Sequence, residues 1–177
     1  MNIPPEQDLL EGARAFNPDS LAVIYDCYAK GLFVYSLRLL GDEHQAKDCV
    51  SETFSRFLKA LRDGNGPKTF LKAYLYRTAH NWITDIYRRS PPPPLELKDN
   101  IKAEENVSPE RQVDSRMDRD RMRLALHRLP SDQRQVIMLR FIEGWEFEQI
   151  AQALQKPAGT IRVLQHRGLE ILRKMLL

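Results

Sequence analysis

The last part of the chain carries the residues best suited to contact with a polyanion. Gln165 and His166 follow Arg162 by three and four residues, Arg173 follows His166 by seven, and Arg167 and Lys174 lie beside them. Such spacing gathers side chains on one face of a helix, where they can donate hydrogen bonds to phosphates and base edges in a major groove. The pattern favours DNA binding. The alternative is a plain helical hairpin with a solvated basic face.

A second polar stripe lies near the middle of the chain. It consists of Arg77, Asn81, Asp85 and Arg88, with His80 and Arg89 adjacent and Tyr76 and Tyr87 at its borders. Basic and aromatic side chains together can clamp and stack unpaired bases. A solvated face beside a core that contains Trp82 explains the same residues equally well.

A third candidate is acidic. Asp48 and Glu52 form an i, i+4 pair close to Phe54 and Leu58, with Arg56 and Lys59 on either side. A charged helix face is usually just solvated, and on pattern alone that interpretation is favoured here.

Catalytic and metal-binding patterns are not found in the sequence. Cys27 and Cys49 both fall on apolar helix faces, which predicts small buried hydrophobic residues. Neither cysteine has metal-ligand spacing to the scattered histidines, and no phosphate loop, nucleophile elbow or HExxH cluster occurs. We therefore expect no enzyme, no metal and no cofactor.

The first 90 residues predict three helices that could position the second and third candidates. Asn17-Pro18 begins a helix that Gly41 ends, and Asp42 with Gln45 forms a capping-box pattern for the next. The segment 63–67 breaks that second helix, and a third follows over about 70–89. The apolar positions of the three predict a buried face made of Leu21, Ile24, Tyr25, Tyr28, Leu32, Tyr35, Leu39, Ala46, Cys49, Val50, Thr53, Phe54, Phe57, Leu61, Phe70, Ala73, Tyr74, Trp82, Ile83 and Ile86.

A linker over residues 91–107 should separate two domains. It opens with four prolines, which cannot continue a helix and favour an extended spacer. The rest is acidic and polar, with too little apolar surface to fold alone. At about 3.1 Å per residue, such a segment reaches roughly 50 Å.

Residues 108–177 predict a helix-turn-helix module. Ser108-Pro109-Glu110 begins a helix to about 128, with Val113, Met117, Leu124 and Ala125 as its inner side, and another helix runs from about 131 to Gly144. Two helices then follow over about 147–154 and 159–176, joined by the short link 155–158. Ala151 and Gly168 are small residues where helices must approach closely. The fold class is therefore all-α, with two small helical domains joined by an extended proline-rich linker.

Composition fits an intracellular DNA-binding protein. Of the 177 residues, 42% are hydrophobic and 29% charged, as in an ordinary globular protein. No stretch is apolar enough to span a bilayer, and residues 1–11 lack the basic region of a signal peptide, so we expect a cytoplasmic protein. Positive charge collects in residues 117–177, which contain 11 basic and 7 acidic side chains.

Two long motifs resemble the extracytoplasmic-function (ECF) sigma factors. The runs Ala46-Lys47-Asp48-x-Val50-x-Glu52-Thr53-Phe54 and Phe70-x-x-Ala73-Tyr74-Leu75-x-x-x-Ala79-x-Asn81-x-x-x-Asp85-x-x-Arg88-Arg89 resemble their region 2. Leu129-Pro130, Gln135-Val136-x-x-Leu139-Arg140, Gly144, Ile150-Ala151, Gly159-Thr160-Ile161-Arg162 and His166-Arg167 resemble their region 4. The order of the two regions agrees as well.

The resemblance implies a role for each candidate surface and names the partners. Core RNA polymerase would contact the first domain, promoter DNA would contact both, and an anti-sigma factor is left open. The residues that would bind core polymerase are Asp48, Glu52, Phe54 and Leu58. Those that would contact the melted −10 element are the loop 64–68, Lys68, Arg77, Asn81, Asp85, Arg88 and Arg89. Those that would contact the −35 duplex are Thr160, Arg162, Gln165, His166 and Arg167.

Two other functions fit the residues without the resemblance. One is a stand-alone helix-turn-helix transcription regulator whose residues 1–90 dimerise or sense a signal. The other is an interaction protein that sequesters a partner. A sigma factor would redirect core polymerase, whereas a regulator would bind promoter DNA without it.

Overall fold

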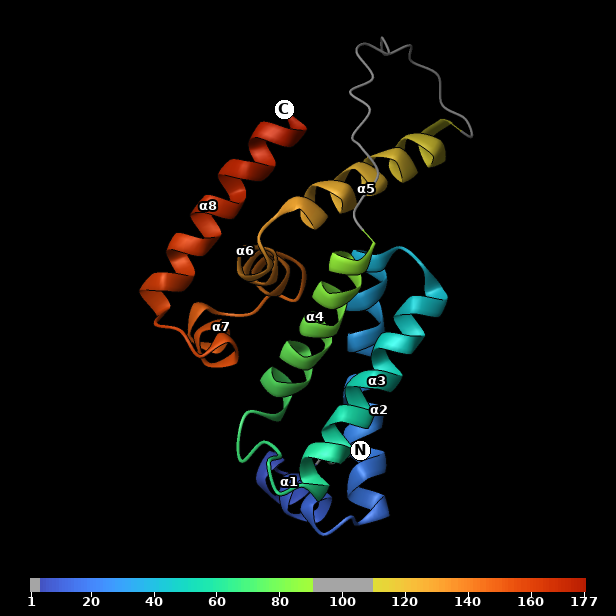
Figure 1. Ribbon diagram of the computed structural model, residues 1–177, viewed down its shortest axis with the longest axis vertical. Coiled ribbons are helices and arrows are strands. Elements are labelled where there is room, and N and C mark those ends of the chain that lie inside the picture. The colour runs from blue at the N-terminus through green and yellow to red at the C-terminus, as the bar shows by residue number, and fades with distance from the viewer. Residues whose placement is uncertain (1–3, 91–109) are drawn as a thin grey trace.

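The computed structural model describes residues 4–90 and 110–177, and side chains in the second range from 116 onward. Helices account for all regular structure in these two ranges (Figure 1). The elements are α1 (Glu6–Arg14), α2 (Pro18–Leu40), α3 (Glu43–Arg62), α4 (Leu71–Arg89), α5 (Glu110–Arg128), α6 (Ser131–Ile137), the π-helix η1 (Met138–Ile142), α7 (Phe147–Leu154) and α8 (Ala158–Leu176). The predicted linker, residues 91–107, lies outside the described ranges. None of these helices is long and apolar enough to span a membrane.

The first domain is a bundle of α2, α3 and α4, with α1 at one end (Figure 1). The predicted caps are confirmed: Asn17 accepts hydrogen bonds from the backbone N–H groups of Asp19 and Ser20, and Asp42 accepts one from Gln45. Gly41 ends α2 with a φ of 71°, in the left-handed region that glycine adopts without strain.

Several expectations about burial in this domain are wrong. Tyr25 and Phe70 were expected in the core, but each side chain is 51% exposed. Cys27 is exposed, whereas Cys49 is buried as expected, and burial raises the pKa of the Cys49 thiol to about 11. The helix α1 was not predicted at all; it packs through Leu9, Leu10 and Ala13.

The second domain consists of α5 to α8. Its helices agree with the predicted segments, except that the expected helix to Gly144 changes from α to π geometry at Met138. Val113 lies outside the described side chains, and Met117, expected on the inner side, is 49% exposed. Gly168 is buried against α6, where an added Cβ would lie 3.1 Å from Cγ1 of Ile137. The close approach that the sequence predicted here is confirmed, and a side chain at this position would require Ile137 to shift.

The two domains contact each other through α4, and His80 is at the centre of the contact. Its imidazole is fully buried, with Nδ1 2.8 Å from the Tyr35 hydroxyl and Nε2 3.1 Å from the Ser131 carbonyl oxygen. A carbonyl can only accept, so Nε2 bears the proton and donates to Ser131, while Tyr35 donates to Nδ1. Burial, together with the nearby Arg134 cation, lowers the pKa of His80 to about 3. The neutral ring thus links α2, α4 and α6.

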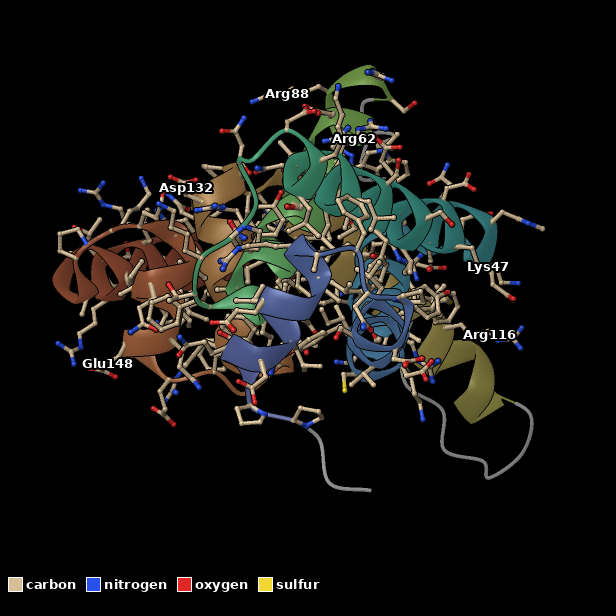
Figure 2. The ribbon with its side chains drawn as sticks, turned by 90° about the horizontal axis from the view of Figure 1, so that it is seen from below. Lys47, Arg62, Arg88, Arg116, Asp132 and Glu148 are labelled. Atoms are coloured by element: carbon tan, nitrogen blue, oxygen red, sulfur yellow. The ribbon has the colours of Figure 1, made fainter. Side chains whose placement is uncertain are left out.

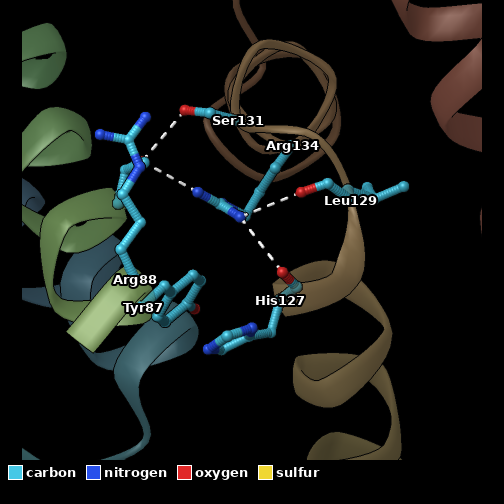
Figure 3. Close-up of a pocket in the computed structure, with 7 residues that line it drawn as sticks. Tyr87, Arg88, His127, Leu129, Ser131 and Arg134 are labelled. Carbon is cyan, nitrogen blue, oxygen red and sulfur yellow. Dashed lines mark hydrogen bonds between the residues drawn. The ribbon is translucent and has the colours of Figure 1, made fainter. Parts of the chain in front are cut away.

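Other side chains extend this contact along α4. At one end, the Tyr76 hydroxyl donates to Oε2 of Glu143 at 3.0 Å, and its ring packs against Trp145. At the other end, Arg134 lies over the Tyr87 ring, which stacks on His127 (Figure 3). Arg134 also donates to the Leu129 and His127 carbonyls and to Thr84, whose hydroxyl lies 3.0 Å from that of Ser131. The guanidinium is thereby held against α4.

The burial of His80 makes stability dependent on pH. Its pKa in the folded protein lies below the usual value of about 6.5, so the neutral ring stabilises the fold above pH 6.5, and this contribution is lost as the pH falls toward 3. We expect the free energy of unfolding to drop below pH 6.5 by up to about 1.4 kcal/mol per pH unit from this group alone.

Chemical denaturation of the wild type and of His80→Gln, followed from pH 7.5 to pH 4.5, measures this contribution. The variant lacks the titrating ring, so its stability should decline less steeply than that of the wild type. Parallel curves for the two proteins would show that His80 is not held neutral.

Candidate nucleic-acid and protein interfaces

The helix-turn-helix unit of α7 and α8 presents the first candidate surface. The helix α7 begins at a capping box in which the Gln149 side chain accepts from the Glu146 backbone N–H at 2.9 Å. Gln155, with a φ of 54°, ends α7 and turns the chain into α8. Ile161, Gly168 and Leu172 face inward as predicted. The opposite face of α8 is therefore free to enter a groove.

The predicted −35 residues divide into two groups around α8. Arg162 and His166 are four residues apart and exposed, so they share one side of the helix, with half-buried Gln165 beside them. Arg162 is also held over the Phe147 ring at 5.0 Å from its centroid. Arg167 follows Arg162 by five residues and so lies about 140° from it around the helix, at 100° per residue. This places Arg167 near the side that Thr160 occupies. The structure thus brings together Arg162, Gln165 and His166 and sets Arg167 and Thr160 apart.

The predicted −10 stripe on α4 is only partly exposed. Asn81, Arg88 and Arg89 are exposed, whereas Arg77 and Asp85 are half-buried. Arg77 is directed toward the second domain, with Nη1 3.5 Å from the Ala153 carbonyl oxygen, and Asp85 forms a 3.6 Å ion pair with Arg88. In Figure 2, which looks along the bundle, Arg62 at the end of α3 projects toward the same side as Arg88, although Figure 1 places the ends of α3 and α4 at opposite ends of the bundle. One side of the first domain therefore combines an amide with several cations.

The side chains expected to border this stripe are not available to bases. His80, Tyr76 and Tyr87 are all buried in the contact between the domains. Burial raises the pKa of the Tyr87 hydroxyl to about 12, and its O–H donates to the Leu39 carbonyl oxygen. Base stacking by Tyr76 and Tyr87 would require the two domains to separate.

The loop 63–70 joins α3 to α4 beside this stripe. Gly64 has a φ of 72°, and its N–H donates to the Leu61 carbonyl. Lys68 is exposed, as its expected role requires, and Phe70 is exposed on a left-handed backbone with a φ of 56°. The loop therefore presents a cation and an aromatic ring at the start of α4.

The acidic pair lies on another side of the first domain. Asp48 is exposed, and Glu52 is half-buried and paired with Arg56 at 2.7 Å. Leu58 is 38% exposed, and the Phe54 ring packs against Tyr25 at 4.9 Å between centroids. A hollow of about 510 Å³ opens between α2 and α3 beside these residues, lined by Tyr25, Ala29, Lys30, Phe33, Lys47, Val50 and Ser51. The surface thus combines carboxylates with a groove lined by aromatic and aliphatic side chains and by two lysines.

Sequence reasoning missed two sets of residues. Tyr25 and Phe33 line the groove, but the regular apolar spacing of α2 placed Tyr25 in the core. The contact between the domains, through Tyr76, Thr84 and Ser131, was not predicted either, because no local pattern reports a partner some 50 residues away in the chain.

Two helical domains, of which the second ends in a helix-turn-helix with an exposed basic face, define a DNA-binding protein. The sequence matches the family described as Sigma-70 region 2 over residues 24–90 and Sigma-70 region 4 over residues 125–174. It is 30% identical over 169 residues to the ECF RNA polymerase sigma factor SigW of Bacillus subtilis, and the aligned region covers 89% of each chain. It is 31% identical over 165 residues to SigL of Mycobacterium tuberculosis, which covers 93% of each.

This chain belongs to the ECF family of RNA polymerase sigma factors, and it directs promoter-specific initiation of transcription. The stand-alone regulator is therefore not favoured. The fold is similar to that of CnrH in its complex with the cytosolic domain of CnrY, with a TM-score of 0.65 and 20% identity over 97% of this chain and 96% of the other. It is also similar to the sigma factor RpoE of Bartonella quintana in complex with the anti-sigma factor NepR, with a TM-score of 0.55 and 21% identity over 86% and 93%.

The two groups of residues on α8 predict different effects on DNA binding. If Arg162 reads a base edge, Arg162→Ala should cost roughly 1–3 kcal/mol on a cognate −35 duplex and relax the preference at one position. Arg167→Ala should weaken binding to all sequences about equally and flatten the salt dependence, as the loss of a phosphate contact does. Affinities measured across a −35 library at several salt concentrations compare the two variants. Identical profiles would contradict the division of roles.

Proposed function

We propose that the chain uses three separate surfaces to bind core RNA polymerase and the two promoter elements. The α2–α3 surface, with Asp48, Glu52, Phe54 and Leu58, contacts the polymerase. The loop 64–68 and the α4 stripe, with Lys68, Arg77, Asn81, Asp85, Arg88 and Arg89, contact the melted −10 strand. The outer face of α8, with Thr160, Arg162, Gln165, His166 and Arg167, contacts the −35 duplex.

The main support for this proposal is that the polymerase surface and the α4 stripe face different sides of the first domain. Seen from the α1 end in Figure 2, Arg88 and Arg62 project from one side and Lys47 of α3 from a second. Polymerase on the α2–α3 surface would therefore leave the α4 stripe accessible to DNA, wherever the second domain lies.

The proposed domains are 1–90 and 108–177, with 91–107 as the linker between them. An anti-sigma factor is a further proposed partner, because the similar structure of Bartonella quintana RpoE is that of a complex with one. Such a partner would compete with the polymerase for the groove between α2 and α3.

The proposed function requires the two domains to separate. Elements at −10 and −35 lie about 25 base pairs apart, or about 85 Å at 3.4 Å per base pair. A compact chain of this length has a radius of gyration of about 16 Å, so its two DNA-contacting faces cannot span that distance while α4 holds the second domain. A linker that reaches roughly 50 Å allows the second domain to move away.

The polymerase surface is tested by reversing its charge. Asp48→Lys combined with Glu52→Lys should reduce the affinity for core polymerase by about tenfold or more, because a reversed charge at an interface meets like charge. The thermal unfolding midpoint should change little, since exposed substitutions and exposed ion pairs contribute within about 0.5–1 kcal/mol.

The chain offers a matched control on the same helix. Glu43 and Glu52 each pair with a cation four residues on, Lys47 and Arg56 respectively. Glu52→Lys should weaken core binding and Glu43→Lys should not. Equal effects of the two single substitutions would show that net charge, and not this surface, governs the affinity.

Domain separation is tested by locking the contact. The hydroxyl oxygens of Thr84 and Ser131 lie 3.0 Å apart, so cysteines at both positions would place sulfur atoms close to a disulfide length of about 2.05 Å. The test protein carries Cys27→Ser together with Thr84→Cys and Ser131→Cys. In its oxidised form it should bind core polymerase, but the resulting holoenzyme should fail to transcribe. Reduction of the disulfide should restore transcription. Full transcription by the oxidised, crosslinked protein would rule out separation as a requirement.

A further inference from the structure

A hydrogen bond from α1 reaches the loop between α3 and α4. Arg14, in the last turn of α1, donates from Nη2 to the Pro67 carbonyl oxygen at 2.9 Å, across 53 positions of sequence. Figure 1 shows α1 beside this loop, at the end of the bundle away from α5. Neither the sequence motifs nor the family match over residues 24–90 includes Arg14.

The backbone that holds Arg14 is itself fixed. Leu9, Leu10 and Ala13 bury one side of α1. After its last turn the chain reverses at Phe16, with a φ of 53°, and the Asn17 N–H donates to the Gly12 carbonyl at 2.9 Å. At Gly12 an added Cβ would collide with the Ser20 hydroxyl, so α1 and α2 meet without free space. The guanidinium therefore extends from a rigid support.

Within the loop, the Arg14 bond falls at buried Pro67, where the half anchored to α3 ends and the last three residues begin. The first half is held to α3 by the Asn65 N–H, which donates to the Ala60 carbonyl at 2.8 Å, and Pro67 is buried. Beyond Pro67, the side chains of Lys68, Thr69 and Phe70 are exposed. The Pro67 carbonyl and the Lys68 N–H belong to one planar peptide unit. A donor that holds this carbonyl therefore fixes the orientation of the peptide from which residues 68–70 continue.

The last three residues of the loop, 68–70, lead into buried Leu71, and the Phe70 carbonyl accepts from the Tyr74 N–H at 3.0 Å. Phe70 adopts a left-handed backbone conformation, which costs about 1 kcal/mol or more for a residue that is not glycine. Such a conformation persists only where its surroundings impose it, and the bond at Pro67 lies three residues before it.

We propose that Arg14 is a positioning residue for the −10 contact: it holds the Pro67–Lys68 peptide so that the loop is already in the conformation that receives an unpaired base. This inference rests on the proposed function of the loop and of α4. Ordering a loop in advance lowers the entropic cost of binding, so loss of the bond reduces affinity for unpaired −10 DNA and leaves the other two surfaces unaffected.

The test uses holoenzyme reconstituted with full-length protein and a fork-junction DNA in which the −10 strand of a mapped promoter is unpaired. Arg14→Ala should weaken binding to this DNA by about tenfold, with core affinity and binding to a −35 duplex within about twofold of wild type. Arg14→Gln, which keeps a neutral donor, should recover most of the affinity. Arg38→Ala, which removes an exposed cation from the last turn of α2, is the matched charge control and should bind as wild type does.

Each alternative result has a defined meaning. Wild-type fork binding by Arg14→Ala overturns the inference, and so does a loss in Arg14→Gln as large as in Arg14→Ala, because charge alone would then explain the effect. If Lys68→Ala and Asn81→Ala both bind the fork as wild type does, the proposed −10 surface is wrong and the role of Arg14 falls with it. If those two lose affinity while Arg14→Ala does not, only the inference about Arg14 fails. Should Arg14→Ala melt at a lower temperature, Arg14→Lys provides a second variant that retains a single donor.

Discussion

The neutral imidazole of His80 is the interaction on which the arrangement of the two domains depends. It accepts from Tyr35 within the first domain and donates to the Ser131 carbonyl of the second, and each bond requires the same tautomer. A protonated ring could not accept from Tyr35, and its charge would be buried beside Arg134. The ring therefore stays uncharged, and its two nitrogens connect a helix of the first domain to a helix of the second. Tyr76 and Thr84, one turn away on either side, repeat the contact along the same face of α4.

This use of α4 explains why its surface differs from that of an ordinary amphipathic helix. One face packs in the bundle through Leu75, Ala79 and Ile83, a second packs on the other domain, and only a narrow strip that includes Asn81 and Arg88 is left for solvent. The bundle face of α4 does not involve the second domain, so the strip proposed to contact DNA stays with the bundle when the second domain moves away. The attachment of the second domain includes side-chain hydrogen bonds and ring contacts along another face of α4.

The sequence predicted what depends on local chemistry and missed what depends on distant partners. Asn17-Pro18, Gly41 and Asp42 set helix ends through their own backbone preferences, and the starts and ends of α2 and α3 were predicted from them. The helix α1 was missed because Pro5 offers no side-chain cap and only three of its residues are buried. Periodicity placed Phe70 in the core, but a left-handed backbone turns its side chain outward just before α4 begins. For the candidate sites, the basic face of α8 was predictable from spacing alone. The burial of His80, Tyr76 and Tyr87 was not, because the residues that cover them belong to the other domain.

The strength of the contact between the domains fits the proposed need for separation. A hydrogen bond contributes a net stabilisation of about 0.5–1.5 kcal/mol, so the bonds made by Tyr76, His80 and Thr84 together contribute a few kcal/mol, and the burial of Trp145 and Tyr87 adds to this. Because the two domains belong to one chain, they lose less translational entropy when they pair than two separate molecules would, which helps this contact to keep them together in the free protein. A single specific base-pair contact contributes about 1–3 kcal/mol, and polymerase binding adds to it. Under the proposed function, binding to the promoter and to polymerase together opposes the contact between the two domains. Neither the −10 nor the −35 element has to break that contact alone.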